Sequence, residues 1–176
     1  MFKKILIGLA VLIVILVIVV AMQPGEFIMS RSVTINAAPD KIYNVLNTMK
    51  RWNDWSPWAK MDPSQVVTFD GPAMGVGASQ SWKGSKTGEG KMTLVESQPG
   101  KLVTFQIDFY KPMTATNMVD FTFEERDKAT LVTWTMGGKN NFIAKAFSLV
   151  MNMEKMMGPV FETGLQNLKA LVESGK

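Results

Sequence analysis

The stretch 102–124, LVTFQIDFYKPMTATNMVDFTFE, alternates apolar and polar side chains on both sides of a Lys-Pro-Met break. Successive side chains of a β-strand point to opposite faces, so this pattern predicts two antiparallel strands joined by a short turn. One face of the pair is predicted to be apolar, with Asn117 as its single amide. That face holds Val103, Phe105, Ile107, Phe109, Ala115, Val119, Phe121 and Phe123.

The same alternation recurs on both sides of this pair, from residue 65 to residue 137. Glycine, proline, lysine and aspartate separate the runs and mark turns, which favours a meander of neighbouring antiparallel strands. A further alternating run precedes the meander. The predicted strands are residues 27–36, 66–69, 78–82, 90–97, 102–110, 114–124 and 130–136.

Helices are predicted at both ends of this sheet. Pro39 and Asp40 suit the first turn of a helix that buries Ile42, Val45, Leu46 and Met49. After Asn140 the apolar spacing becomes helical and continues to Val172, with a kink or restart expected at Gly158-Pro159. The predicted fold class is therefore α+β: a curved antiparallel sheet of about seven strands wrapped around a long C-terminal helix.

The N-terminus carries a different signal. The run Ile5–Met22 has no charge and no proline, and at about 1.5 Å per residue it can cross most of the hydrocarbon layer of a membrane. It follows Lys3 and Lys4, and Pro24-Gly25 ends it. We therefore predict one transmembrane signal anchor at residues 1–22, a linker at 23–26 and one globular domain at 27–176.

The position of the basic residues predicts the orientation of this anchor. Lys3 and Lys4 precede the span and tend to stay in the cytoplasm, which places the domain on the extracytoplasmic side. We expect a single-pass protein of the plasma (inner) membrane with a periplasmic domain. A cleaved signal peptide is the alternative, since Val19-Val20-Ala21 loosely resembles a cleavage site.

Composition excludes several classes of function. The chain has no histidine, which removes the commonest general base and metal ligand, and no cysteine, which removes disulfides and thiol nucleophiles. Of 19 basic residues two are Lys3 and Lys4, so the remainder nearly balances 15 acidic ones and predicts no nucleic-acid partner. We assign no catalytic residue, no metal site and no cofactor.

Four segments resemble one known family. They are RSVTINAAPDKIY at 31–43, WNDWSPW at 52–58, GPAMGVG at 71–77 and FETGLQNLK at 161–169. Together they are similar to the SRPBCC superfamily of START/Bet v 1-like helix-grip domains, in its polyketide cyclase/dehydrase-like branch. The resemblance covers about residues 27–173. It implies a fold that encloses a hydrophobic ligand, but no shared catalytic motif.

The candidate ligand-binding residues follow from strand alternation, from the tryptophan segment and from the last helix. Inward-facing strand positions and the final helix should enclose an apolar cavity with a few polar groups that orient the ligand. The predicted cavity residues are Trp52, Trp55, Trp58, Gln80, Trp82, Phe105, Ile107, Asn117, Val119, Phe121, Trp134, Met153, Met157 and Phe161.

Some assignments have two interpretations. Asn117 and Gln80 either orient a ligand or are ordinary buried amides with partners in the protein. The tryptophans at 52, 55 and 58 either form a wall of the cavity mouth or cap the core between helix and sheet. Glu96 is the main inward-facing carboxylate, although a glutamate at a strand end is more often solvated than catalytic.

The sequence favours a membrane-anchored binding module over an enzyme. Its expected partners are a lipid or another hydrophobic small molecule in the cavity, and the membrane through Ile5–Met22, while a protein partner stays unknown. One alternative is a polyketide cyclase or dehydratase-like enzyme, which rests on the resemblance alone. The other is an interaction module of an envelope stress response, with the tryptophan segment contacting a protein.

Overall fold

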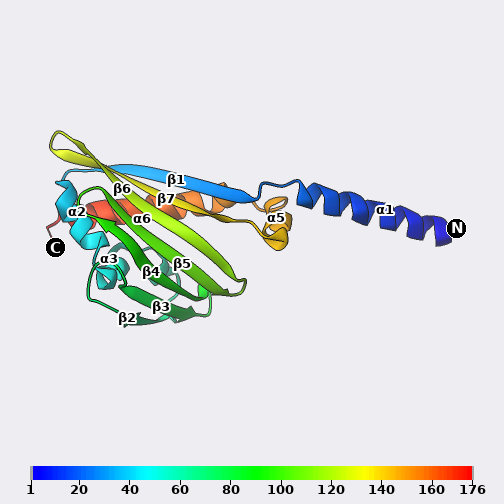
Figure 1. Ribbon diagram of the computed structural model, residues 1–176, viewed down its shortest axis with the longest axis horizontal. Helices are drawn as coiled ribbons and strands as arrows, with labels where there is room; N and C mark the ends of the chain where they lie inside the picture. The colour runs from blue at the N-terminus through cyan, green and yellow to red at the C-terminus, as the bar shows by residue number, and fades with distance from the viewer. Residues whose placement is uncertain (1, 176) are drawn as a thin grey trace.

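The sheet has seven antiparallel strands in the order β1-β7-β6-β5-β4-β3-β2, and it curls around one long helix (Figure 1). The computed structural model describes residues 2–175, so residue 1 of the predicted anchor and residue 176 of the predicted domain lie outside the described residues. The α+β prediction is confirmed. The strands are β1 Glu26–Ile35, β2 Val66–Asp70, β3 Ser79–Gly84, β4 Gly88–Gln98, β5 Leu102–Lys111, β6 Ala115–Arg126 and β7 Ala129–Lys139.

The helices lie where the apolar spacing predicts them. The first, α1, is apolar throughout and extends away from the sheet, whereas α6 runs along the concave face (Figure 1). Between β1 and β2 the chain makes a series of short helices. The helices are α1 Phe2–Ala21, α2 Pro39–Leu46, η1 Met49–Arg51, α3 Trp52–Trp55, α4 Trp58–Met61, α5 Phe142–Ser148 and α6 Met153–Glu173.

The space between the curved sheet and α6 is called the grip, and the core fills the half of it that is farthest from α1. There α2 closes the end of the sheet and α6 buries Leu165 and Leu168 against it. Side chains from the strand ends far from α1 complete this packing, and those of β5 and β6 lie on the face predicted to be apolar. They include Ile35, Leu94, Val103, Phe105, Phe121 and Val132, all fully buried.

A kink or a restart of the C-terminal helical segment was expected at Gly158-Pro159, and no restart occurs there. The helix α6 runs through Pro159 without interruption, and the break lies earlier, between the end of α5 and Met153. Proline at this point removes one backbone bond, the one to the carbonyl of Lys155, while Asn152 caps the new helix by accepting from Lys155 N at 3.0 Å.

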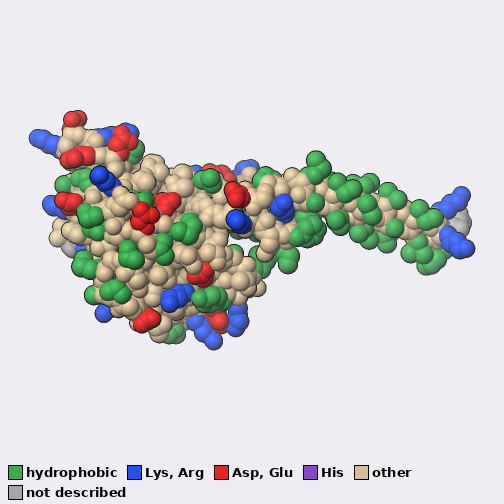
Figure 2. Space-filling model, viewed as in Figure 1, with side chains coloured by type: hydrophobic (Ala, Val, Ile, Leu, Met, Phe, Trp, Pro, Cys, Tyr) green, Lys and Arg blue, Asp and Glu red, His purple; other side chains and the backbone are tan. Residues whose placement is uncertain are grey.

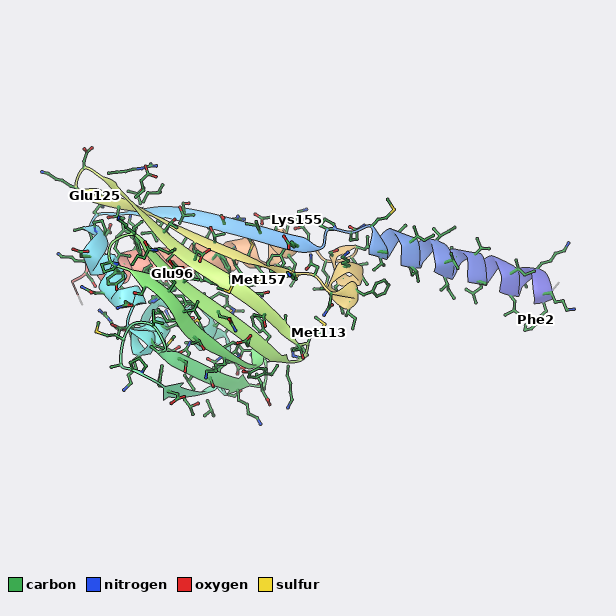
Figure 3. The ribbon with its side chains drawn as sticks, viewed as in Figure 1. Phe2, Glu96, Met113, Glu125, Lys155 and Met157 are labelled. Atoms are coloured by element: carbon green, nitrogen blue, oxygen red, sulfur yellow. The ribbon has the colours of Figure 1, made fainter. Side chains whose placement is uncertain are left out.

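Glu96 does not face inward, so this expectation was wrong. A bulge between Leu94 and Glu96 inserts one residue into β4, which turns the Glu96 side chain outward, where it is exposed and bonded to Gln98 (Figure 3). Ser97 takes the inward position instead. Its hydroxyl lies 2.8 Å from the Tyr43 hydroxyl and donates to Asn47 Oδ1 at 2.7 Å.

Candidate functional site

A cavity of about 610 Å³ occupies the half of the grip nearest α1. The strand register explains its place, because the inward residues at this end come from the start of β6, the end of β5 and the end of β7. Asn117 pairs with Ile107 on one side and with Gly138 on the other, and all three face the same side of the sheet. The half of the concave surface far from α1 is packed with side chains, and the half near α1 is open.

Small residues keep this half open. Gly90 and Gly138 occupy inward positions where a strand would normally project a side chain. A Cβ at Gly138 would meet the Asn117 amide, and a Cβ at Gly90 would meet the Trp82 ring. The absence of a Cβ at Gly90 lets Trp82 lie across β4, where its Nε1 donates to Thr87 O at 3.2 Å, and the absence of one at Gly138 makes room for the Asn117 amide.

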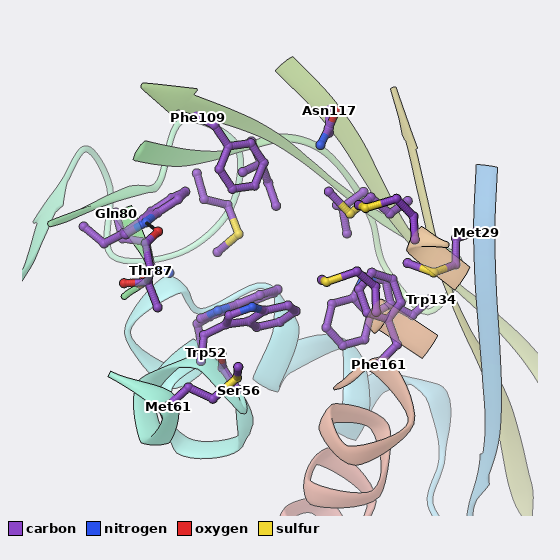
Figure 4. Close-up of a pocket in the computed structure, with 18 of the residues that line it drawn as sticks. Met29, Trp52, Ser56, Met61, Gln80, Thr87, Phe109, Asn117, Trp134 and Phe161 are labelled. Carbon is purple, nitrogen blue, oxygen red and sulfur yellow. Dashed lines mark hydrogen bonds between the residues drawn. The ribbon is translucent and has the colours of Figure 1, made fainter. Parts of the chain in front are cut away.

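Aromatic rings form much of the cavity wall (Figure 4). Trp134 stacks on Phe161 with ring centroids 4.1 Å apart and an interplanar angle of 13°, which fixes the wall contributed by β7 and α6. Trp52 faces this pair across the cavity floor and contacts Trp134 edge to face at 6.1 Å. Phe109 lies on the opposite side (Figure 4).

The structure brings most of the predicted cavity residues together, and three lie elsewhere. Trp55, Phe105 and Phe121 belong to the solid core, because their side chains are buried behind the wall and do not line the cavity. The tryptophan segment therefore serves both proposed purposes, with Trp55 in the core. The predicted residues on the wall are Trp52, Trp58, Gln80, Trp82, Ile107, Asn117, Val119, Trp134, Met153, Met157 and Phe161.

Asn117 and Gln80 are two of the polar side chains in this mostly apolar wall, which also includes Asn53, Ser56, Gln65 and Thr87. Asn117 is 7% exposed and Gln80 5%, and both line the cavity. Among the described residues, the side-chain amide of Asn117 has no hydrogen bond and Gln80 Oε1 is buried without a partner, as are Ser56 Oγ and Trp134 Nε1 on the same wall. Buried amides normally have partners, so these two leave hydrogen-bonding capacity unused at the cavity.

Charged groups stand only at the cavity rim. Within the described part of the chain, Glu154 is the one acidic side chain on the wall and Lys86 the one basic side chain. Glu154 is engaged by Arg31, whose Nη2 lies 2.6 Å from Glu154 Oε1 and whose Nε lies 2.8 Å from Glu162 Oε1. These two carboxylates raise the pKa of Arg31. With one carboxylate among the described lining residues, the wall offers no acid–base pair of carboxylates.

The family model of polyketide cyclase / dehydrase and lipid transport proteins matches residues 26–173, nearly the whole domain described above. The chain belongs to this family. The resemblance seen in the sequence to the polyketide cyclase/dehydrase branch of SRPBCC proteins is thereby confirmed. No curated protein sequence matches the chain.

Solved structures share the fold of this family member at low sequence identity. Protein CV1439 from Chromobacterium violaceum is 15% identical, with 85% of this chain and 98% of that one covered and a TM-score of 0.59. The Aha1 dimer from Colwellia psychrerythraea is 21% identical, with 85% and 98% covered and a TM-score of 0.60. Ara h 8.0201 is 11% identical, with 85% and 99% covered and a TM-score of 0.55.

The likeness to these structures supports the fold of the domain. The helix α1 itself is long and apolar enough to cross a membrane by length and composition, and a signal sequence would have the same features. Its side chains are almost all exposed in the structure.

The buried carboxylate of Asp62 fixes the backbone at the rim of the cavity. Asp62, 1% exposed, accepts hydrogen bonds from Lys86 N at 2.7 Å and Thr87 N at 3.0 Å, which fixes the β3–β4 turn whose residues line the cavity. Its other oxygen accepts from the Ser64 hydroxyl at 2.5 Å. The Ser64 bond, followed by these backbone donors, lowers the pKa of Asp62 below its usual range.

This arrangement predicts a pH-dependent stability. Because the folded-state pKa of Asp62 lies below the value of about 3.9 for an unfolded chain, its contribution is complete above that value. The contribution is lost as the pH falls from there toward the folded pKa. Asp62→Asn should lower the free energy of unfolding at neutral pH and reduce its fall between neutral pH and acid. Urea unfolding at both pH values measures this.

Asp127→Asn is the matched control for that experiment. Asp127 is exposed in the β6–β7 turn at φ 54°, a conformation that asparagine also tolerates. The control should follow the parent protein at both pH values. An Asp62→Asn protein with the parent's pH dependence would show that the Asp62 network contributes nothing to stability.

Several lining residues were not among the sequence predictions. Alternation carries the signal for Met29, Met92, Phe109 and Met136, which share the inward parity of residues that were predicted. The others lie near strand ends, on short helices, in turns or in the first turn of α6, where alternation alone did not assign them to the cavity. They are Phe27, Ile28, Asn53, Ser56, Met61, Gln65, Val67, Lys86, Thr87 and Glu154.

Proposed function

We propose that this protein is a membrane-tethered binding module for a lipid or another hydrophobic small molecule. The observation that carries the proposal is the cavity of about 610 Å³, which lies within the usual range for small-ligand sites. An open apolar cavity lowers the stability of a protein because its lining lacks packing contacts, and a bound ligand supplies those contacts.

The shape and polarity of the cavity support a mostly apolar ligand with a polar group. Aromatic and methionine side chains offer apolar surface, and methionine adapts to variable ligand shapes. The amides of Asn117 and Gln80 supply donors and acceptors deep in this surface. A ligand carbonyl, hydroxyl or carboxyl group held by these amides satisfies groups that lack partners in the protein itself.

The tether is the second part of the proposal. An α1 helix that remains uncleaved holds the domain on the extracytoplasmic side of the inner membrane, with Lys3 and Lys4 in the cytoplasm. Tethering raises the local concentration of the binding site beside a membrane that supplies lipid ligands.

Native mass spectrometry with solvent extraction tests the binding function. Residues 23–176 form the sample, since the solved relatives consist of this domain over almost their whole length. We expect a co-purifying hydrophobic molecule that solvent extracts from the folded domain. An empty domain that also binds no hydrophobic probe would contradict the proposal and favour a surface that meets a protein partner.

A cyclase or dehydratase activity is the second candidate function, favoured by the family description alone. The cavity lining argues against it, because the acidic side chain at the rim is paired with Arg31 and the chain has no histidine. If the extracted molecule is returned chemically changed by the domain, the enzyme candidate replaces the binding module.

A further inference from the structure

The segment between β7 and α6 exposes an unusually apolar surface. Val150 is 81% exposed and Phe147 48%, and their neighbours along the segment are similar. Soluble domains rarely expose apolar side chains in such a concentration unless something covers them. The residues at 142–151 do not line the cavity, so ligand binding does not explain them. The exposed members are Phe142, Ile143, Phe147, Leu149, Val150 and Met151, and the exposed side chains of Met153 and Met156 continue this surface into the start of α6.

This apolar segment lies against the end of α1. The two helices α1 and α5 are in contact, and Figure 1 shows α5 between the body of the domain and the membrane helix. Lys145 Nζ donates to the carbonyl of Ala21 at 3.2 Å, at the last residue of α1. Hydrophobic side chains cover α1 in Figure 2 and continue on to the adjoining end of the domain.

Hydrogen bonds hold the linker, so the orientation of the domain on α1 is restrained. Asn140 N donates to Gly25 O at 2.8 Å, and Asn140 Nδ2 donates to Pro24 O at 3.2 Å. The end of β7 is thereby fixed to the exit of α1. Because α5 begins at Phe142, two residues after Asn140, it stays beside the C-terminal end of α1.

Charge and capping also fit a position in the headgroup layer of a bilayer. The segment 139–155 contains Lys139, Lys145 and Lys155 against one acidic residue, Glu154, and lysines beside apolar side chains favour anionic lipid surfaces. Asn141 accepts from Ala144 N at 2.9 Å and caps α5. The first turn of α5 therefore enters the interface with one of its free backbone donors already bonded.

We infer that residues 142–153 dock into the interfacial layer of the bilayer that α1 crosses, so that the cavity opens on to lipid instead of water. The inference rests on the tether in the proposed function. The cavity lies at this same end of the sheet, and Ile28 and Met153 line it while remaining exposed. A lipid leaving the acyl-chain layer then reaches the cavity along an apolar path.

Site-specific fluorescence in the full-length protein tests this position. The chain has no cysteine, so each single-cysteine variant carries one environment-sensitive fluorophore without background labelling. The protein is reconstituted in vesicles of phosphatidylcholine and phosphatidylglycerol that carry nitroxide lipids, with the nitroxide either near the headgroup or near the end of the acyl chain. The test sites are Phe147→Cys and Val150→Cys.

Two reference sites calibrate the measurement. Val14→Cys lies in the middle of α1 and should be quenched by the deep nitroxide. Glu125→Cys lies at the end of the domain opposite to α1 (Figure 3) and should not be quenched by either lipid. We expect the labels at positions 147 and 150 to be quenched by the shallow nitroxide and to emit at shorter wavelength than the label at position 125.

The outcomes separate this inference from the proposed function. Labels at 147 and 150 that resemble the Glu125 label, with the Val14 label deep, overturn the docking inference and leave the tether intact. A Val14 label outside the deep layer overturns the tether and with it the inference. Ligand binding by the domain in the mass spectrometry experiment is independent of all these readings.

A double variant tests whether docking delivers ligand. Phe147→Asp with Val150→Asp should slow the uptake of anthroyloxy-labelled stearate from these vesicles by about tenfold, because two charged side chains oppose interfacial burial. Its affinity for the same probe dispersed in water should match the parent protein. The control Met118→Asp lies on the outer sheet face and should leave uptake unchanged. Unchanged uptake in the double variant overturns the inference.

Discussion

Replacing Trp55 with alanine is expected to lower the free energy of unfolding by about 3–5 kcal/mol, the usual cost of truncating a buried aromatic side chain. Trp55 is 1% exposed and is surrounded by other rings. Its ring centroid lies 4.6 Å from Trp52, 5.5 Å from Trp134 and 5.8 Å from Phe121, all in edge-to-face geometry. Truncation leaves a cavity in the part of the grip that is solid in the parent protein.

Urea unfolding of the domain, monitored by circular dichroism, measures this loss. Trp82→Ala is the control, since Trp82 lies on the cavity wall and is partly exposed, so its removal enlarges an existing space and should destabilise the domain less. If both variants lose equal stability, or if Trp55→Ala loses less than Trp82→Ala, Trp55 does not have the core position that the structure gives it.

The sheet and its inward face could be predicted because alternation in strands is strictly local information. The positions of Ile107 and Asn117 on one face followed from residue parity within 102–124, and the register pairs these two residues directly. The same parity gives a wrong answer wherever a strand contains an extra residue. Glu96 is the example, since the bulge after Leu94 depends on pairing with β5 and leaves no mark on the composition of β4.

Parity also does not reveal which part of the concave face is filled. Phe105 and Ile107 have the same parity on β5, yet Phe105 is fully buried in the core and Ile107 faces open space. The difference depends on what lies opposite, because α2 and α3 pack against one end of the sheet only. That arrangement is a matter of tertiary packing, which strand periodicity does not reveal.

The tryptophan segment is a second case in which a local sequence pattern does not predict the tertiary arrangement. A spacing of three would place all three rings on one side of a single helical turn, but the chain forms two short helices separated by Ser56 and Pro57. The prolyl residue starts the second turn, as its fixed backbone angle favours. Trp58 contacts Trp134 and Phe161, whereas Trp52 contacts Trp134 together with the core rings of Phe105 and Phe121. One motif contributes to both core and cavity.

The open half of the grip implies that stability and binding compete at the same positions. Filling an apolar cavity with a side chain usually stabilises a protein by about 0.5–2 kcal/mol, because contacts replace empty space. The same side chain would occupy the volume that a ligand needs. A substitution that projects into the cavity without disturbing the core should therefore change the two quantities in opposite directions.

Ile107→Trp is expected to show this opposition most clearly. Ile107 is partly exposed to the cavity, so the larger ring has room to extend between Asn117 and Met92, whereas fully buried neighbours such as Val119 have none. We expect the Kd for anthroyloxy-labelled stearate to rise by about tenfold to a hundredfold, the equivalent of about 1–3 kcal/mol of steric conflict. The free energy of unfolding of the ligand-free domain should hold or increase.

Met118→Trp provides the comparison that makes the result specific. Met118 is adjacent to Asn117 on β6 but points to the outer face and is 41% exposed, so the same indole is added outside the cavity. Its Kd should match the parent value. An Ile107→Trp domain with parent affinity would place the probe elsewhere, whereas loss of both affinity and stability would indicate a disrupted fold. Only weaker binding in a domain at least as stable as the parent identifies this half of the grip as the ligand site.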